Sequence, residues 1–277
     1  MVLSVDPDVM FPFERLRILP FARYSGAFNM AVDRYFAQIA EDEDDAVLRF
    51  YGWDPYCLSL GYHQDGQQVD RGALLEDGCD LVRRPTGGSA IFHSEELTYG
   101  LIVPGRNRDK EKIYHSFHYL LHRTLRQLGY PVQLQLHDDH QNYLKKGAQS
   151  FACFNRSAYT EITFDDKKVV GSAQKIYKSA VLQHGSILLD DKQNSIIRYL
   201  KVSKEAKQKY LDLLKKQSIA LKKINNQAVN EINIAEKLVQ EFGKTGNISI
   251  YFKDLTSEEY DQIQKYNTSV VLNGTLL

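Results

Sequence analysis

Apolar residues recur at two different periods along the chain, and these periods predict both helices and strands. Between residues 28 and 39 they recur every three or four positions after Ser25, a residue type that caps helix N-termini. A second helical pattern covers residues 109–128, whereas residues 46–51 and 56–61 read as short strands. The elements lack the regular strand-helix rhythm of a doubly wound sheet. The pattern therefore predicts an α+β domain with a mixed sheet flanked by helices.

Two alternating stretches on either side of residues 165–166 predict a β-hairpin with an acidic turn. In the second arm, a period of two places Lys168, Val170 and Ser172 on one face. If that face is covered, the Lys168 ammonium must lie opposite a carboxylate, a phosphate or a developing oxyanion. A solvated turn lysine beside Lys167 fits the same pattern equally well.

The C-terminal third has a different character. Residues 201–223 are rich in lysine and residues 235–242 are amphipathic, and both stretches are typical of surface helices. The pattern at residues 248–252 fits a returning strand or a poorly ordered segment. We expect a main domain over residues 1–195 and a short, mainly helical extension over residues 196–277, although Pro and Gly are too sparse there to mark a sharp boundary.

Composition narrows the class of protein. The 277 residues have a formal net charge of zero, and 43% are hydrophobic, which is enough for a large buried core. No excess of basic residues indicates nucleic acid or an anionic membrane as a partner, and no apolar run approaches the ~20 residues of a bilayer span. Residues 1–15 lack the pattern of a secretory signal. We expect a cytoplasmic protein that binds neither nucleic acid nor membrane.

The three cysteines point to the same compartment. Cys57, Cys79 and Cys153 form no Cys-x-x-Cys pair, and any single disulfide would leave one of them unmatched. Free thiols are typical of a reducing compartment.

The densest chemical motif is Arg-Arg-Pro-Thr-Gly-Gly-Ser-Ala at residues 83–90. Adjacent arginines, a proline that keeps its neighbour extended and a glycine pair free to take positive φ predict a loop that closes around a small anionic or carbonyl-bearing group. Taken alone, the motif also fits a hairpin turn with solvated arginines. A second polar-glycine motif over residues 168–188 favours the binding loop. The candidate binding residues are Arg83, Arg84, Thr86, Gly87, Gly88, His93, Gly171, Ser172, His184 and Gly185.

Histidines occur both inside and outside these motifs. His115, His118 and His122 have helical spacing, but no cysteine or patterned carboxylate accompanies them, so we expect a solvated helix face and no metal site. Residues 137–140, His-Asp-Asp-His, read as a turn. His93 and His184 adjoin the glycine motifs, where they could contact a ligand or simply hold the backbone through hydrogen bonds.

These motifs together resemble the lipoate-protein ligase and octanoyltransferase family, which shares the biotin-ligase catalytic fold. The matching segments occur in the family's order at residues 29–33, 60–64, 83–99, 168–174 and 182–188. The resemblance implies that residues 1–195 form a catalytic domain of this fold. It also implies that Lys168, three positions before the Gly-Ser-Ala, contacts the acyl carbonyl.

The segment Phe-Ala-Cys-Phe-Asn at residues 151–155 distinguishes members of this family. Considered alone, Cys153 between two phenylalanines reads as a small buried hydrophobe, although its polar neighbours indicate a loop. ATP-dependent ligases of the family tend to carry a Gly-Arg-Asn-Asp-like segment there. One octanoyltransferase subgroup resembles this chain in having Cys-Phe, with the cysteine as acyl acceptor. The resemblance therefore implies that Cys153 is the nucleophile.

The implied activity is transfer of an octanoyl or lipoyl group, through a cysteine acyl-enzyme, to a lysine of a lipoyl-accepting domain. The implied donor is acyl carrier protein, and the implied acceptors are lipoyl domains of 2-oxoacid dehydrogenases or the glycine cleavage H protein. No cofactor is expected, and Val170, Leu182 and Tyr99 are candidates to line the acyl tunnel. The alternatives are an ATP-dependent lipoate ligase using ATP and Mg, a lipoyl amidotransferase, and, less favoured because Lys168 and Cys153 are both present, a binding protein without turnover.

Overall fold

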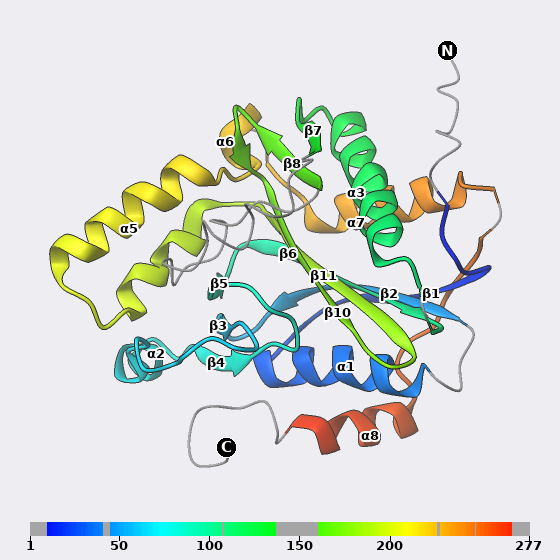
Figure 1. Ribbon diagram of the computed structural model, residues 1–277, viewed down its shortest axis with the longest axis horizontal. Coiled ribbons are helices and arrows are strands. Elements are labelled where there is room, and N and C mark those ends of the chain that lie inside the picture. Colours follow the sequence, from blue (N-terminus) through cyan, green and yellow to red (C-terminus); the bar gives the residue numbers. More distant parts are fainter. Residues whose placement is uncertain are drawn as a thin grey trace.

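Six strands form the central sheet of the protein (Figure 1). The computed structural model describes residues 10–40, 45–106, 108–136, 160–225, 228–246 and 248–267. In sheet order the strands are β10 (Val170–Ile176), β11 (Ala180–Leu188), β6 (Glu96–Pro104), β2 (Ala46–Trp53), β1 (Arg15–Tyr24) and β12 (Ser249–Phe252). β1 runs parallel to β2 and β12, and the other neighbouring pairs are antiparallel. The predicted mixed sheet is therefore confirmed.

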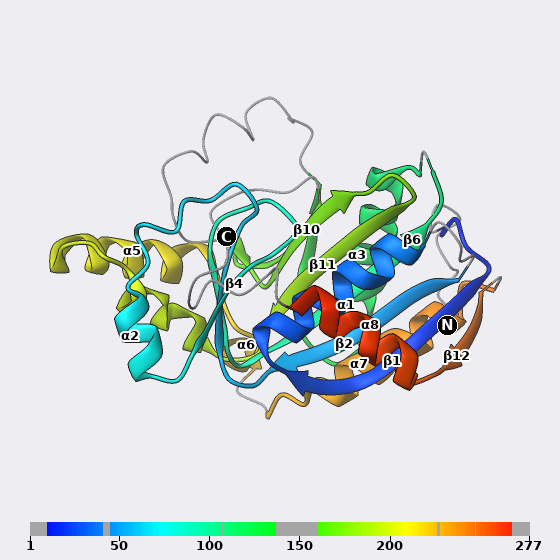
Figure 2. The ribbon, with the colours of Figure 1, turned by 90° about the horizontal axis from the view of Figure 1, so that it is seen from below.

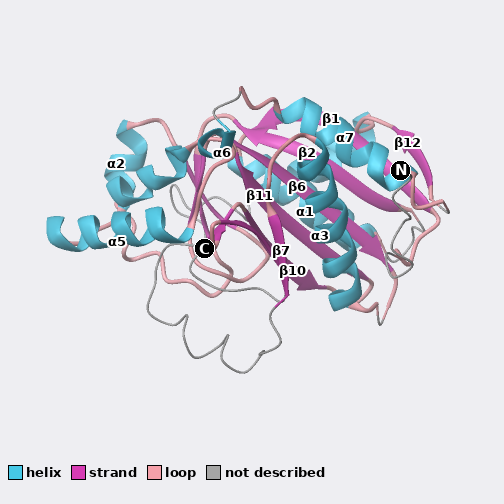
Figure 3. Ribbon diagram, turned by 90° about the horizontal axis from the view of Figure 1, so that it is seen from above, coloured by secondary structure: helices cyan, strands magenta, loops and turns pink. Residues whose placement is uncertain are grey.

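Helices cover both faces of this sheet. α1 (Gly26–Ile39) and α8 (Ser257–Asn267) lie on the face seen from below in Figure 2, and α3 (Lys110–Gln127) and α7 (Glu231–Gly243) lie on the face seen from above in Figure 3. The Ser25 hydroxyl accepts the Phe28 N–H at 3.3 Å, and the Asp109 carboxylate accepts two amides at the start of α3. Such caps matter because the first N–H groups of a helix have no partner within it. Both predicted helices are confirmed.

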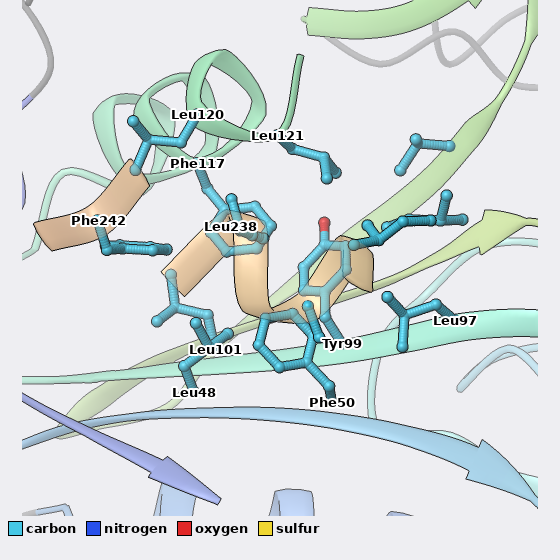
Figure 4. Close-up of a cluster of buried hydrophobic side chains, with 14 of the residues drawn as sticks. Leu48, Phe50, Leu97, Tyr99, Leu101, Phe117, Leu120, Leu121, Leu238 and Phe242 are labelled. Carbon is cyan, nitrogen blue, oxygen red and sulfur yellow. The ribbon is translucent and has the colours of Figure 1, made fainter. Parts of the chain in front are cut away.

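The period of two along the strands gives the two faces of the sheet different chemistry. Odd-numbered residues of β6 over 97–103 project into the core beneath α3 and α7, where Figure 4 shows Leu97, Tyr99 and Leu101 among leucine and phenylalanine side chains. The even-numbered residues face α1. Thr98 on β6 and Ser186 on β11 are register partners among them. Polar side chains therefore gather at one end of the sheet, on the α1 side.

Two three-stranded sheets complete the framework around this polar end. The first contains β4 (Asp80–Arg83), β3 (Cys57–Leu60) and β5 (Ile91–His93), in that order. The second contains β7 (Gln133–Leu136), β8 (Thr160–Phe164) and β9 (Lys167–Lys168), in that order. The remaining helices are α2 (Arg71–Glu76), a 3-10 helix (Asp191–Tyr199), α5 (Lys204–Gln217) and α6 (Lys222–Asn225).

Segments on both sides of residue 195 share one core. α7 places Leu238 and Phe242 in the same cluster as Phe117 of α3, and β12 extends the main sheet beside β1. α7 is thus more deeply buried than the surface helix expected at residues 235–242. Residues 248–252, for which the sequence left two possibilities, contain strand β12. The division at residue 195 remains a sequence-based expectation.

Among the described residues, no helix combines the length and the apolar character that crossing a bilayer requires.

We predict that Phe242→Ala lowers the free energy of unfolding by about 3 to 5 kcal/mol, because it leaves a cavity where three elements meet. The Phe242 ring lies 4.9 Å from the Phe11 ring and 5.9 Å from the Phe117 ring, centroid to centroid. Urea unfolding followed by circular dichroism measures the change. Phe252→Ala is the matched control, since Phe252 is 66% exposed and should change stability by less than about 0.5 kcal/mol. Similar losses for the two variants would contradict the shared core.

Candidate active site

Arg83 holds a neighbouring loop in place. Its Nη1 donates to the carbonyl oxygens of Gly61, Tyr62 and Gln64 at 2.9, 3.0 and 2.7 Å. Nη1 carries two hydrogens, so at least one of them is shared between two of these carbonyl oxygens. Arg83 is half-buried, and the structure places its head group against this backbone.

Arg84 closes the glycine loop upon itself. Its side chain is buried, and it donates to the carbonyl oxygens of Ser59, Gly87 and Ser89 at 3.2, 2.9 and 2.8 Å. The buried charge is thereby surrounded by acceptors, as a buried cation requires. The loop from residue 84 to residue 89 is consequently folded around one guanidinium.

Glycines allow the two loops to touch. A Cβ at Gly61 would lie 1.9 Å from the Gly88 carbonyl oxygen, so no side chain can be accommodated there. Gly88 has φ of 100°, a left-handed conformation that favours glycine. A Cβ at Gly87 would meet no described atom within 4 Å. The loop therefore leaves open space beside its backbone at Gly87.

His184 connects the glycine loop to helix α1. Its Nε2 lies 2.6 Å from Thr86 Oγ1, and its Nδ1 lies 3.1 Å from Asp33 Oδ2. Burial, the largest effect, lowers the pKa of His184 below its ordinary value even though Asp33 acts in the opposite direction. A neutral ring that donates from Nδ1 to the carboxylate accepts the Thr86 hydroxyl proton at Nε2. The hydrogen bond between Thr86 and His184 thus holds the glycine loop against β11.

Asp33 is neutralised by a buried arginine. Arg49 Nη1 lies 2.8 Å from Asp33 Oδ1, and Arg49 also donates to the main-chain and side-chain oxygens of Asn29. Burial alone would raise the pKa of the Asp33 carboxyl, but the Arg49 charge and the His184 hydrogen bond outweigh burial and hold that pKa below its usual value. Asn29 and Asp33 are one helical turn apart, so α1 presents both to the same side.

His93 lies in a second hydrogen-bonded chain. Its Nε2 is 2.7 Å from Ser59 Oγ, its Nδ1 is 2.7 Å from Glu96 Oε1, and its ring stacks on Trp53 with centroids 3.9 Å apart. All four side chains are buried. Their contacts join β3, β5, β6 and β2.

Glu96 also orients two hydroxyl groups at the cavity wall. Thr98 Oγ1 and Ser186 Oγ each donate to Glu96 Oε1 at 2.6 Å. Burial would raise the pKa of Glu96, but His93 and these hydroxyl donors hold it below its usual value, so the carboxylate is ionised and only accepts. Both hydroxyl protons therefore point away from the cavity.

Lys168 lies at the junction of two sheets. Asp165 and Asp166 form the hairpin turn with φ of 48° and 58°, as a two-residue type I′ turn requires. At Val169 the chain leaves β8 and joins β11, since its N–H donates to the Ile162 carbonyl and its own carbonyl accepts from Leu188. The predicted hairpin is confirmed, with this change of sheet after Lys168.

The Lys168 ammonium is buried against a carboxylate. The Lys168 side chain is 10% exposed, and its Nζ lies 2.7 Å from Glu161 Oε1, whose side chain is 9% exposed. Of the opposite groups that the sequence allowed, a carboxylate is the one observed. The preceding residue, Lys167, is less buried. The Lys168 charge is thus compensated within the protein while the residue lines a cavity.

A cavity of about 270 Å³ collects most of the predicted binding residues. The predicted binding residues that line it are Arg84, Gly87, Gly88, His93, Gly171, Ser172, His184 and Gly185, and Lys168, the predicted contact of the acyl carbonyl, lines it as well. The cavity lining does not include Arg83 or Thr86, which hold the loops instead. It also does not include Val170, Leu182 and Tyr99, the expected tunnel residues, whose side chains pack into the cores.

Sequence reasoning missed several lining residues: Met30, Tyr51, Trp53, Ile91, Thr98, Ala173, Gln174 and Ser186. Two of them carried a usable signal. Thr98 and Ser186 are polar residues at alternate positions of strongly apolar strands, a pattern that indicates one polar face.

The expected solvated histidine face is wrong for His118. This residue is 1% exposed, with Nδ1 2.9 Å from the Tyr114 carbonyl and Nε2 3.0 Å from Ser172 Oγ. His115 and His122 are half-buried and contact Thr160 Oγ1 and the Val132 carbonyl. Spacing along a helix does not say which face another element covers. Among the described residues, no group of three or more His, Cys, Asp or Glu side chains is arranged to hold a metal.

Two sequence predictions concern residues that the structure does not describe. Cys153, the predicted nucleophile, lies outside the described residues, and so does the predicted turn at residues 137–140. The other two cysteines, Cys57 and Cys79, are buried free thiols, and burial raises the pKa of both.

Known proteins are similar to this one over most of the chain. The lipoyl protein ligase A/B catalytic domain matches residues 25–243. The chain belongs to this family. As a member of the lipoyl ligase family it is an acyltransferase. The matched region extends beyond residue 195.

Relatives within the lipoyl ligase family are similar along nearly their whole length. Octanoyltransferase LipM of Kyrpidia tusciae is 33% identical over 257 residues, covering 90% of this chain and 93% of the relative. Octanoyltransferase LipM of Bacillus subtilis is 31% identical over 257 residues, covering 90% and 92%.

Solved structures confirm the fold. A bi-partite lipoate protein ligase from Thermoplasma acidophilum has a TM-score of 0.74 at 19% identity and covers 92% of both chains. Lipoate-protein ligase A bound with ATP has a TM-score of 0.72 at 21% identity, covering 92% of this chain and 94% of that chain. At this identity the likeness concerns the fold alone.

We predict that Asp33→Asn lowers the free energy of unfolding at pH 7 by about 3 to 5 kcal/mol, because it leaves the Arg49 charge buried without its counter-ion. The pKa of Asp33 is lower in the folded protein than in the unfolded chain, where it is ~3.9. The ionised carboxylate therefore contributes to folding stability above the unfolded pKa, and this contribution is lost as pH falls through the folded pKa. The gap between wild type and variant should therefore narrow below about pH 4.

Urea titrations at several pH values measure this gap. Asp77→Asn is the control, because its pair with Arg198 lies at the surface and should leave the midpoint near that of wild type. A gap that stays constant down to pH 3 would contradict the assigned role of Asp33.

Proposed function

We propose that this protein transfers an octanoyl group from a carrier thioester to a lysine of a lipoyl-accepting protein domain, in lipoate assembly. Relatives 31% and 33% identical to it are named octanoyltransferases, whereas the ligases of similar fold are 19% and 21% identical. The observation that carries the proposal is the buried Lys168 ammonium at the cavity wall. Acyl transfer passes through an oxyanion, and a buried cation stabilises such a charge.

The proposed route has two steps through Cys153. In the first step the Cys153 thiolate attacks the thioester carbonyl, a new C–S bond forms, and the carrier leaves as its thiolate. In the second step the ε-amine of the acceptor lysine attacks the acyl-enzyme, and Cys153 leaves. The thioester supplies the driving force for the amide bond, so this route needs neither nucleotide nor metal.

Lys168 is the proposed oxyanion donor in both steps. Its ammonium would interact with the acyl carbonyl oxygen, together with backbone N–H groups near Gly87 and Gly88. His184 and Gly185 were also expected to donate, but they lie in β11 between two paired strands, where their N–H groups belong to the sheet. The open space beside Gly87 supports this arrangement, because the substrate must approach the backbone closely. Glu161 compensates the Lys168 charge when no substrate is bound.

The proposed partners follow from the reaction. The donor would be octanoyl acyl carrier protein, and the acceptors would be lipoyl domains of 2-oxoacid dehydrogenases or the glycine cleavage H protein. The Thermoplasma acidophilum ligase was described together with an E2 lipoyl domain. We place the reaction in the cytoplasm, where free thiols such as those of Cys57 and Cys79 persist.

The alternatives share the same residues and differ in the donor. An ATP-dependent lipoate ligase would use ATP and Mg to form an acyl-adenylate beside the arginine-glycine loop, with Cys153 structural. A lipoyl amidotransferase would take its acyl group from a lipoylated domain. Intact mass after mixing with octanoyl-carrier protein, without nucleotide, separates them. A gain of one octanoyl group supports the transferase, whereas ATP-dependent adenylate release, or acylation by a lipoylated domain alone, contradicts it.

We predict that Cys153→Ala abolishes octanoyl transfer and leaves the fold intact, since it removes the acyl acceptor of the first step. Transfer to a lipoyl domain, followed by mass spectrometry, measures the effect. Cys57→Ala and Cys79→Ala are the controls and should keep near wild-type turnover. Wild-type transfer by Cys153→Ala would rule out the covalent route.

We predict that Lys168→Ala lowers single-turnover transfer by about 100-fold or more, as expected when an oxyanion donor is lost. Lys168→Arg should not restore the rate, because a planar guanidinium does not replace a compact ammonium. Lys167→Ala is the matched control and should behave as an ordinary surface change. Equal losses at the two lysines would show that the assignment of the donor is wrong.

A further inference from the structure

Ser172 lies at the cavity wall with two buried polar groups behind it. Its Oγ is 3.0 Å from His118 Nε2 and 2.6 Å from the Tyr99 hydroxyl oxygen. His118 on α3 and Tyr99 on β6 are both buried, whereas Ser172 is half-buried and lines the cavity. Figure 4 shows the Tyr99 hydroxyl directed away from β6. Ser172 is therefore the point at which this buried cluster meets the cavity.

The hydrogen positions in this cluster follow from its partners. The Tyr114 carbonyl can only accept, so His118 Nδ1, 2.9 Å away, carries a hydrogen. Burial, the largest effect, lowers the pKa of His118 to about 4, so the ring is neutral at pH 7 and its Nε2 carries none. Nε2 accepts the Ser172 hydroxyl proton. Ser172 in turn accepts from Tyr99, whose pKa burial raises to about 12.

This arrangement decides what Ser172 can bind. A hydroxyl has one hydrogen and two lone pairs. The Ser172 hydrogen goes to His118 and one lone pair accepts from Tyr99, so a group approaching from the cavity meets the second lone pair. An N–H group can bind there as a donor. An acyl carbonyl oxygen, which only accepts, cannot.

We propose that Ser172 binds the ε-amine of the acceptor lysine in the second step, with His118 as the positioning residue that keeps the Ser172 lone pair toward the cavity. This inference rests on the proposed function. The donor thioester also offers N–H groups if its thiol belongs to a pantetheine arm, but the nearer of the two pantetheine amides is separated from the sulfur by two carbons. The amine, by contrast, must lie beside the carbonyl that it attacks.

Lys168 and Ser172 line the same cavity. The chain changes sheet at Val169, between these two residues, and both of them border this one cavity. A carbonyl held by Lys168 would therefore have Ser172 beside it.

The step balances without a net proton on His118. The amine nitrogen attacks the acyl-enzyme carbonyl, a C–N bond forms, and the C–S bond to Cys153 breaks. One amine hydrogen stays on the amide nitrogen and the other ends on the Cys153 sulfur. The nitrogen is positively charged in the tetrahedral intermediate, and an acceptor at Ser172 stabilises that charge.

The test separates the two half-reactions. The octanoyl-enzyme is formed with octanoyl-carrier protein and followed by intact mass, and its reaction with a lipoyl domain is then timed in single turnover. Ser172→Ala and His118→Phe should form the acyl-enzyme at near wild-type rates. Both should transfer it about 10- to 100-fold more slowly at saturating lipoyl domain, with the half-saturating concentration unchanged.

Three further variants sharpen the result. His118→Gln keeps an acceptor for Ser172 and should recover part of the rate. Tyr99→Phe leaves the bond from Ser172 to His118 and should slow transfer less than Ser172→Ala does. His122→Phe is the matched control on the same helix, because His122 contacts the Val132 carbonyl and should transfer at the wild-type rate.

Two results would overturn the role of Ser172. One is a slowing of acyl-enzyme formation in the variants equal to the slowing of transfer, which would indicate contact with the donor thioester or a general structural role. The other is transfer by Ser172→Ala at the wild-type rate. If His118→Phe fails to fold, Ser172→Ala and His118→Gln still decide the question. Absence of an acyl-enzyme in the wild-type protein would instead refute the covalent route, and the role of Ser172 with it.

Discussion

The buried ion pair between Asp33 and Arg49 determines where the parts of the candidate site lie. Asp33 uses one oxygen for Arg49 and the other for His184, and His184 in turn holds Thr86 of the glycine loop. One carboxylate thus joins helix α1, two strands of the main sheet and the loop that borders the cavity. Neither charge of the pair reaches water, so each depends on the other. The pair thus links the position of the loop to β11 through His184 and Thr86.

Local patterns predicted some of the elements that carry the site, but not the strands β4, β5, β6 and β11. Helical spacing predicted α1 and α3, and alternation predicted the hairpin whose turn at residues 165–166 has the required positive φ values. Eight of the ten candidate binding residues in and beside the glycine motifs line one cavity, together with Lys168. Arg83 and Arg84 show where a pattern stops being informative. Their partners are backbone carbonyls, which every residue possesses, so no side-chain pattern could indicate which carbonyls they hold.

His118 shows a second limit of sequence reasoning. The spacing of His115, His118 and His122 was compatible with a solvated face, but the burial of a helix face depends on the elements that pack against it. Here β8 and β10 do so, and both come more than thirty residues later in the sequence. His118 therefore lies behind the cavity wall, hydrogen-bonded to Ser172. Only the tertiary arrangement distinguishes it from its two neighbours on the helix.

The imidazole rings of His184 and His118 make the same pattern of hydrogen bonds but have different roles. His184 and His118 both donate from Nδ1 and accept a hydroxyl proton at Nε2, from Thr86 and Ser172 respectively. Behind His184 lies a carboxylate, and its hydroxyl partner Thr86 is fully buried, so the chain of contacts serves to hold a loop. Behind His118 lies a neutral carbonyl, which gives a protonated ring no counter-charge, and its partner Ser172 borders the cavity. The neutral ring then leaves the free lone pair of Ser172 toward the cavity, where an attacking amine requires an acceptor.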